Sequence, residues 1–186
     1  MANACFVTGA TGFIGKRLVA RLLARDEGPV YFLVHPRSVG KLDALYARWG
    51  VDRAKAICVL GDLTAPGLGI APDDAAMLEG RVRHFFHLAA VYDLAASAEA
   101  QHAANVDGTR HAVAFATTIG AGCFHHMSSI AAAGLYDGTF TEDMFDEAEN
   151  LRKLPRQVDS SKLEFPRRAI ARGSALAAGS LAHRAV

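Results

Sequence analysis

The chain has 186 residues, about half of them apolar, and its 20 Lys and Arg nearly balance its 19 Asp and Glu. A chain of this size can form one domain with a substantial core, and its composition is typical of a soluble globular protein. The apolar runs have strand length, so we expect no membrane span, and "MANACFVTGA" lacks the pattern of a secretion signal. The three cysteines lie in apolar runs, so we expect buried free thiols and a cytoplasmic protein; they are Cys5, Cys58 and Cys123.

Apolar runs alternate with segments of helical periodicity along most of the chain. The expected strands are 4–9, 30–35, 56–63, 83–90 and 123–129. The expected helices are 13–25, about 38–48, 72–79, roughly 97–118 and 160–172. Strands that are apolar on both faces and separated by helices predict an α/β protein with a doubly wound parallel sheet and right-handed crossovers.

Three glycines mark the junction between the first strand and the first helix, in "FVTGATGFIGKRL". Gly9 permits the tight turn that leaves the strand, Gly12 lets a pyrophosphate approach the backbone, and Gly15 lets the helix pack closely on the sheet. The free N–H groups at the start of that helix then face the anion. This context, a strand, a glycine loop and a helix, predicts a Rossmann-type dinucleotide site.

Five motifs in order resemble those of the extended short-chain dehydrogenase/reductase family: "TGATGFIG" (8–15), "GDL" (61–63), "HLAA" (87–90), "NVDGT" (105–109) and "MSSIAAAG" (127–134). The resemblance implies an adenine contact after the third strand, a loop that lies against the cofactor after the fourth strand, and an asparagine that braces the central strands. The cofactor-binding residues that it implies are Gly9, Thr11, Gly12, Phe13, Ile14, Gly15, Asp62, Leu63, Ala89, Ala90, Asn105 and Lys162.

Within that family, "HLAAVYDLAASAEAQHAANVDGTRHAV" and "FTEDMFDEAENL" look most like the fatty acyl-CoA or thioester reductase branch. That branch reduces an activated acyl group or an aldehyde with NADPH, so the resemblance implies a small acyl or aldehyde substrate. The sugar-nucleotide epimerases and dehydratases share the fold and remain the nearest alternative.

The end of the second strand favours NADP over NAD. NAD-selective domains usually place a carboxylate there to accept a hydrogen bond from the ribose 2′-OH. This chain reads "LVHPRSVGK", with no acid between Tyr31 and Lys41 and with Arg37 where a 2′-phosphate would lie. A guanidinium favours a phosphate by its charge and its planar fork. NAD remains the alternative if Arg37 is a solvated loop cation.

The catalytic residues that the resemblance implies are only partly present. The family uses a serine, and a tyrosine four residues before a lysine, so that the lysine lowers the pKa of the phenol that exchanges a proton with substrate. Ser129 and Lys162 fit two of these roles, but Val158 stands where the tyrosine would be. No Tyr-x-x-x-Lys exists in the chain. Tyr136, seven residues after Ser129 in an expected loop, is a poor replacement for the missing tyrosine. A non-catalytic dinucleotide-binding module therefore stands beside the reductase as a second hypothesis.

The resemblance extends to about residue 165, which predicts a binding domain at 1–165 and a basic, poorly ordered tail at 166–186. Residues 151–186 carry eight Lys or Arg against two Asp or Glu. The tail lacks interleaved aromatic residues and a binding motif, so we do not expect a nucleic-acid partner. We expect a shortened or degraded member, with a sheet that is incomplete at its C-terminal side. Family members often dimerise through the Tyr/Lys helix, so a homodimer is the oligomer to test.

Eight histidines raise the question of a metal site. His125 and His126 are adjacent on one expected strand, so their side chains point to opposite faces. Without a cysteine or carboxylate recognised at ligand spacing, we expect no metal ion.

Overall fold

The computed structural model describes residues 3–91, 97–128 and 182–183, and the strands within these ranges form one parallel sheet. The strand order is β3-β2-β1-β4-β5-β6. The strands are β1 (Ala4–Thr8), β2 (Val30–Val34), β3 (Ala56–Leu60), β4 (Val82–His87), β5 (Cys123–His126) and the short β6 (Ala182–His183). The chain moves outward from β1 to β3 and then returns to the other side of β1, so the order reverses between β1 and β4.

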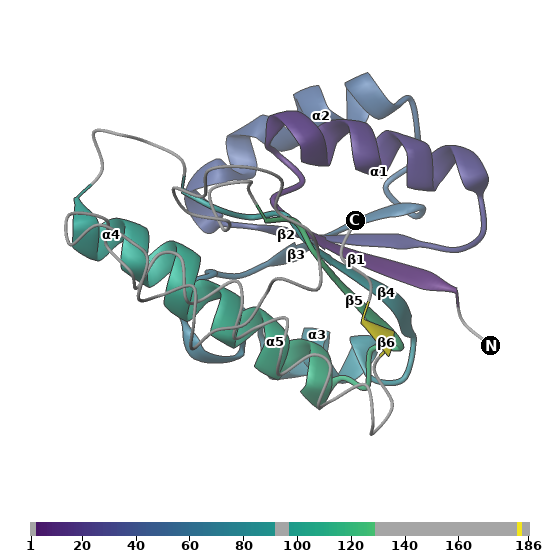
Figure 1. The fold of residues 1–186 in the computed structure, drawn as a ribbon. Helices are drawn as coiled ribbons and strands as arrows, with labels where there is room; N and C mark the ends of the chain where they lie inside the picture. The colour runs from purple at the N-terminus through teal and green to yellow at the C-terminus, as the bar shows by residue number, and fades with distance from the viewer. Residues whose placement is uncertain (1–2, 92–96, 129–181, 184–186) are drawn as a thin grey trace, which may run out of the picture.

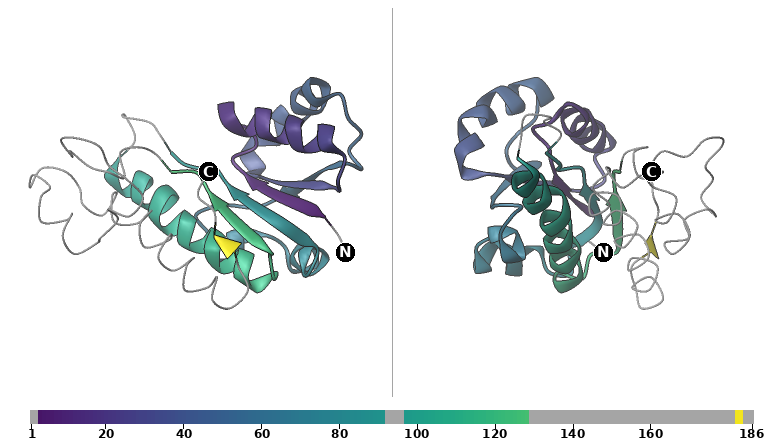
Figure 2. Two further views of the ribbon diagram at one scale, coloured as in Figure 1. Left: turned by 45° about the vertical axis from the view of Figure 1, so that its right-hand side comes forward. Right: turned by 60° about the vertical axis from the view of Figure 1, so that its left-hand side comes forward.

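Helices cover both faces of the sheet, as the doubly wound prediction requires. In Figures 1 and 2, α1 and α2 lie on one side of the strands, and α3 and α5 lie on the other. The helical segments are α1 (Phe13–Arg25), η1 (Pro36–Lys41), α2 (Leu42–Trp49), η2 (Pro66–Gly69), α3 (Pro72–Leu78), α4 (Ala98–His102), η3 (Ala103–Asp107) and α5 (Gly108–Thr118). The doubly wound α/β fold is therefore confirmed.

Alternating residues of the central strands build two separate apolar layers. Phe6 faces the α5 layer, where its ring stacks on Phe85 with centroids 4.8 Å apart. Its neighbour Val7 faces the α1 and α2 layer, which also contains Phe32 and Trp49. Because strand side chains alternate between faces, one central strand serves both layers, and its end is held rigidly between them.

Two predicted helices differ from the observed ones for local reasons. The helix expected from about 38 begins as the 3₁₀ segment η1, because Pro36 occupies its first turn and the His35 ring accepts from the Arg37 N–H. Regular α-helix follows only in α2. The helix expected over 97–118 is interrupted by a π-helical turn, η3, which contains Asn105. The expectation of three buried thiols was wrong in part: Cys123 is buried, whereas Cys5 and Cys58 are half-buried.

The expected helix 160–172 lies outside the described residues. Of the expected tail at 166–186, the structure describes only Ala182–His183, which pair in parallel with β5. Within the described ranges, no helix combines the length and apolar character needed to cross a bilayer.

Candidate dinucleotide-binding site

The glycine loop lies where β1 and β4 diverge, at the carboxyl ends of the strands. Gly9 has a φ of +75°, and a Cβ built there would lie 2.7 Å from the backbone nitrogen of Ala89. A Cβ at Gly15 would collide with the Gly9 carbonyl oxygen. Any side chain at Gly9 or Gly15 would therefore push the loop away from β4 or α1 away from the sheet. In doubly wound sheets, ligands bind in the crevice at such a reversal of strand order.

The start of α1 presents its backbone to this crevice. Gly12 is the N-cap residue, its N–H donates to the Gly9 carbonyl at 3.0 Å, and no side chain caps the helix. Thr11 is half-buried, whereas Phe13 is 74% exposed and Ile14 is 50% exposed. The first N–H groups of a helix have no intrahelical acceptor. An anion that approaches along the exposed side of Gly12 would meet these donors and the positive end of the helix dipole.

A buried chain of hydrogen bonds connects β1 to the end of β4 and to α5. The Thr8 hydroxyl lies 2.8 Å from His87 Nδ1, and His87 Nε2 lies 3.0 Å from the Thr109 hydroxyl. Thr109 Oγ1 also lies 2.8 Å from the Asn105 carbonyl, to which it donates. Thr109 must then accept from His87 Nε2–H, so Thr8 donates to the bare Nδ1. Burial lowers the pKa of His87 to about 3, so the ring is neutral.

Asn105 secures the loop that follows β4. Its side-chain oxygen accepts from the Val91 N–H at 2.8 Å, and its side-chain nitrogen donates to the Val91 carbonyl at 2.9 Å. Upstream in the same loop, the Ala89 N–H donates to the Thr8 hydroxyl at 3.2 Å, and Ala90 is exposed. Asn105 was expected to brace the central strands, and its side-chain contacts in the described residues are instead with the loop that follows β4.

Polar side chains meet at the ends of β2 and β3. His35 Nε2 lies 3.7 Å from Asp62 Oδ2, and Asp62 Oδ1 accepts from both the backbone N–H and the hydroxyl of Thr64. These two hydrogen bonds lower the pKa of Asp62, with smaller contributions from the nearby charges of His35 and Arg37. The Asp62 carboxylate is therefore charged and oriented, and Arg37 is exposed beside it.

Leu63 is half-buried between the β3 loop and α5. A Cβ built at Gly108 would lie 2.7 Å from Leu63 Cγ, so the absence of a side chain at Gly108 makes room for Leu63. The ring of His111 lies 3.3 Å from the Leu63 carbonyl. These contacts fix the loop that carries Asp62 against the helix that carries Asn105.

The described residues fit a bound dinucleotide. The glycine loop forms a cradle that Cβ atoms would fill, and no side chain caps the N–H donors at the start of α1. The loops after β2 and β3 lie at the same end of the sheet, beside the end of β1. The expected catalytic residues Ser129 and Lys162, together with Val158 and Tyr136, lie outside the described residues. Lys162 is thus also untested as a cofactor contact.

The sequence reasoning missed three residues of this site. Thr8 and His87 each begin a family motif and end an expected strand, but neither was given a role of its own. A polar residue at the end of each of two neighbouring strands is a usable signal of contact there. His35 was read only as part of a segment without acids. Its position one residue after β2, with Asp62 two residues after β3, places both at one sheet edge.

This fold and this site define an NAD(P)-binding Rossmann domain. The male sterility protein family of NAD-binding domains matches residues 7–174, and the chain belongs to that family.

Among curated relatives, one component of the linear gramicidin synthase of Brevibacillus parabrevis is 29% identical over 86% of this chain and 3% of its own length. The fatty acyl-CoA reductase wat of Drosophila melanogaster is 30% identical over 61% of this chain and 25% of its own length. The chain thus spans a quarter or less of these two relatives.

Solved structures agree with the fold. The terminal R domain of the myxalamid PKS-NRPS pathway superposes with a TM-score of 0.75 at 21% identity, over 98% of this chain and 48% of that chain. MoeE5, solved in complex with UDP-glucose and NAD, superposes with a TM-score of 0.64 at 23% identity, over 98% of this chain and 53% of that chain. At such identities the likeness establishes the fold.

Proposed function

We propose that this chain is the cofactor-binding part of an NADPH-dependent reductase that acts on a fatty acyl thioester or an aldehyde. The observation that carries the proposal is the cradle between Gly9, Ala89 and the uncapped start of α1 at Gly12. The curated relatives named above include a fatty acyl-CoA reductase, which supports an activated acyl substrate over a sugar nucleotide. NADPH, when bound, supplies a hydride for the substrate carbonyl.

The choice of NADPH over NADH rests on the β2 and β3 ends. Residues 35–41 contain His35, Arg37 and Lys41 and no acid. The nearby Asp62 carboxylate is engaged, because Oδ1 accepts twice from Thr64 and Oδ2 faces His35. It is therefore a poor free acceptor for a ribose 2′-OH, whereas the exposed Arg37 can pair with a 2′-phosphate.

Fluorescence titrations with NADPH and NADH test this preference. Arg37→Ser should weaken NADPH binding about 10- to 100-fold, the value of a charge-assisted contact, and leave NADH binding unchanged. Arg53→Ser is the matched control. Arg53 is exposed and pairs with Asp43 at a distance of 2.7 Å, and it precedes β3, at the strand end opposite to the glycine loop. Equal affinity for the two cofactors, or an unchanged NADPH affinity in Arg37→Ser, would contradict the NADP assignment.

A non-catalytic dinucleotide-binding module is the second candidate function, and the valine at position 158 favours it. Valine cannot donate a proton to the substrate oxygen, and loss of a general acid costs about 10²- to 10⁴-fold in rate. Turnover assays with long-chain acyl-CoA and aldehyde separate the candidates. Turnover by the unaltered chain would reject the non-catalytic module. Turnover gained only in Val158→Tyr would show that valine blocks a site that is otherwise complete.

A further inference from the structure

We propose that His84, Cys123 and His125 form a binding site for a zinc-type divalent cation on the α1 face of the sheet. The ligand atoms of these three side chains all lie within 4.8 Å of one another. Nothing in the dinucleotide site uses them. Cys123 begins β5 and His84 lies in the first half of β4, whereas the glycine loop follows the carboxyl end of β1.

Strand register explains why the three side chains converge. His84 on β4 is the register partner of Cys123 on β5, so their side chains share one face. His125 is two residues beyond Cys123 on the same strand, which returns its side chain to that face. The expectation of no metal site considered His125 with its neighbour His126 and missed this spacing of two between a cysteine and a histidine.

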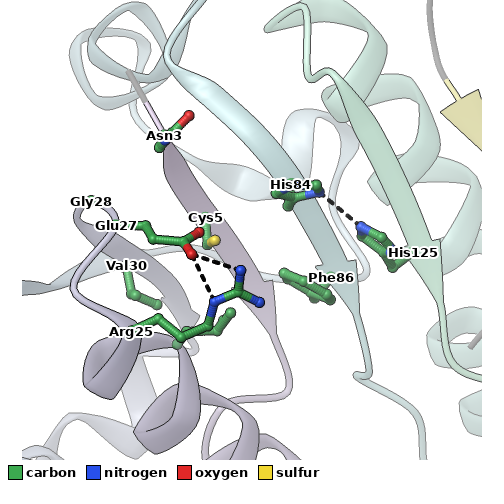
Figure 3. A pocket seen from close by; sticks show the side chains of 10 residues that line it. Asn3, Cys5, Arg25, Glu27, Gly28, Val30, His84, Phe86 and His125 are labelled. Carbon is green, nitrogen blue, oxygen red and sulfur yellow. Dashed lines mark hydrogen bonds and ion pairs between the residues drawn. The ribbon is translucent and has the colours of Figure 1, made fainter. Parts of the chain in front are cut away.

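The facing nitrogens of the two imidazoles are already nearly as far apart as two ligand atoms on one zinc ion. His84 Nδ1 lies 3.0 Å from His125 Nε2, and Figure 3 shows the two rings pointing toward each other across the strands. Tetrahedral zinc with bonds of about 2.0–2.3 Å separates its ligand atoms by about 3.3–3.8 Å. The 3.0 Å between the two nitrogens is slightly below that range, and the separations to the third ligand atom are no larger than 4.8 Å. Binding therefore requires small adjustments of these side chains.

An aromatic neighbour holds one of the two imidazole ligands in place. The ring of Phe86 stacks on His125 with centroids 4.4 Å apart and holds its orientation. Neutral histidine and thiolate are the ligands that zinc takes in proteins.

A pocket of about 180 Å³ provides room for a fourth ligand. Its lining includes His84, His125, Cys5, Arg25 and Glu27. Arg25 is ion-paired with Glu27 at 2.6 Å, which offsets its charge beside an incoming cation (Figure 3). We therefore assign three protein ligands and one water to the ion.

Binding requires a defined loss of protons. The Cys123 thiol gives up its proton to solvent, and the imidazole that now donates in the His84–His125 hydrogen bond moves its proton to its other ring nitrogen. Both imidazoles stay neutral, so one proton is released for each ion bound. The bound ion would replace the shared proton between two neighbouring strands and connect β4 to β5.

Cobalt titration of the full chain without nucleotide tests the site, because a thiolate–Co²⁺ bond gives an ultraviolet charge-transfer band. We expect one Co²⁺ per chain, displacement by Zn²⁺, release of one proton per Zn²⁺, and a Tm that rises with the logarithm of free Zn²⁺. Cys123→Ala should abolish the charge-transfer band, and His84→Gln should weaken binding at least tenfold.

The control is Cys58→Ala, since Cys58 is a half-buried cysteine on β3 that lies outside the cluster. This variant should keep the band and the proton release. Circular dichroism and urea unfolding establish that each variant is folded before it is titrated, and His84→Gln provides the test if Cys123→Ala does not fold. The proposal is overturned if the unaltered chain shows no thiolate band at Co²⁺ concentrations up to about 100 µM, or if the band survives in Cys123→Ala.

Discussion

The Thr8 hydroxyl donates to the bare Nδ1 of the fully buried His87 across 2.8 Å, where the adjacent strands β1 and β4 end. The same Thr8 oxygen accepts from the N–H groups of Leu88 and Ala89, each at 3.2 Å. One hydroxyl thus joins the strand that leads into the glycine loop to the loop that follows β4. The position of both walls of the candidate crevice depends on this contact.

Thr8→Val should uncouple these two loops. The valine keeps the shape of threonine but leaves His87 Nδ1 and two backbone N–H groups without the hydroxyl, at a cost of about 1–3 kcal/mol in the free energy of unfolding. Urea unfolding measures that loss, and NADPH titration should show weaker binding. Thr8→Ser keeps the hydroxyl and should retain most of the affinity. Equal behaviour of the valine and serine variants would contradict this role.

Gly9→Ala should destabilise the protein more than Gly50→Ala, because a side chain at Gly50 would point into open space. Both Gly9 and Gly50 have positive φ, at +75° and +62°, but only Gly9 has backbone atoms within 4 Å of a built Cβ. Gly50→Ala carries the left-handed backbone cost of about 1–2 kcal/mol alone. Gly9→Ala adds the collision with Ala89, so its midpoint in urea should be lower and NADPH binding should be lost. If the two variants lose equal stability, the close approach of the Ala89 backbone adds no cost at Gly9.

The stability of the protein should fall in mild acid because of His87. Its pKa is about 3 in the folded protein, against an ordinary value of 6.5. Below pH 6.5 the unfolded chain takes up a proton that the folded protein refuses until about pH 3. The free energy of unfolding should therefore fall with decreasing pH, by about 1.4 kcal/mol per pH unit in the middle of that window.

Urea unfolding of the unaltered chain and of His87→Gln at pH 7, 6 and 5 measures this contribution. The glutamine variant lacks the titrating ring, so its stability should depend less on pH, while the contributions of the other titrating groups cancel in the comparison. Parallel pH profiles for the two proteins would show that His87 does not govern the acid sensitivity.

Asn105→Ala should release the loop after β4. It removes two hydrogen bonds to the half-buried Val91, which should cost about 1–3 kcal/mol. Hydrogen exchange at the Val91 amide should accelerate, because that N–H loses its acceptor. Thr117→Ala is a control on α5, since its hydroxyl only donates within the helix to the Val113 carbonyl. An unchanged exchange rate at Val91 in Asn105→Ala would reject the bracing role.

The order of the central elements could be predicted because their signals are local, although the strands expected over 56–63, 83–90 and 123–129 end earlier, at Leu60, His87 and His126. The helix 13–25 was predicted with the limits that α1 has, since a glycine loop begins it and apolar residues recur within it at helical spacing. In the structure, Asp26 ends it in the left-handed conformation. The tight turn at Gly9 was predicted for a similar reason, because the glycine loop that makes it is continuous in sequence, whereas the opposite wall of the cradle comes from Ala89. The NADP preference and the roles of Ser129 and Lys162 stay predictions.

The contacts that hold the cradle are of another kind. Thr8 and His87 are 79 residues apart, and His84 and His125 are 41 residues apart. Hydrophobic periodicity along the chain shows which residues are buried, but it does not show which strand ends lie side by side. Sheet order and register make these polar pairs, so the buried histidine bridge and the His–Cys–His cluster emerge only when β4 is placed between β1 and β5.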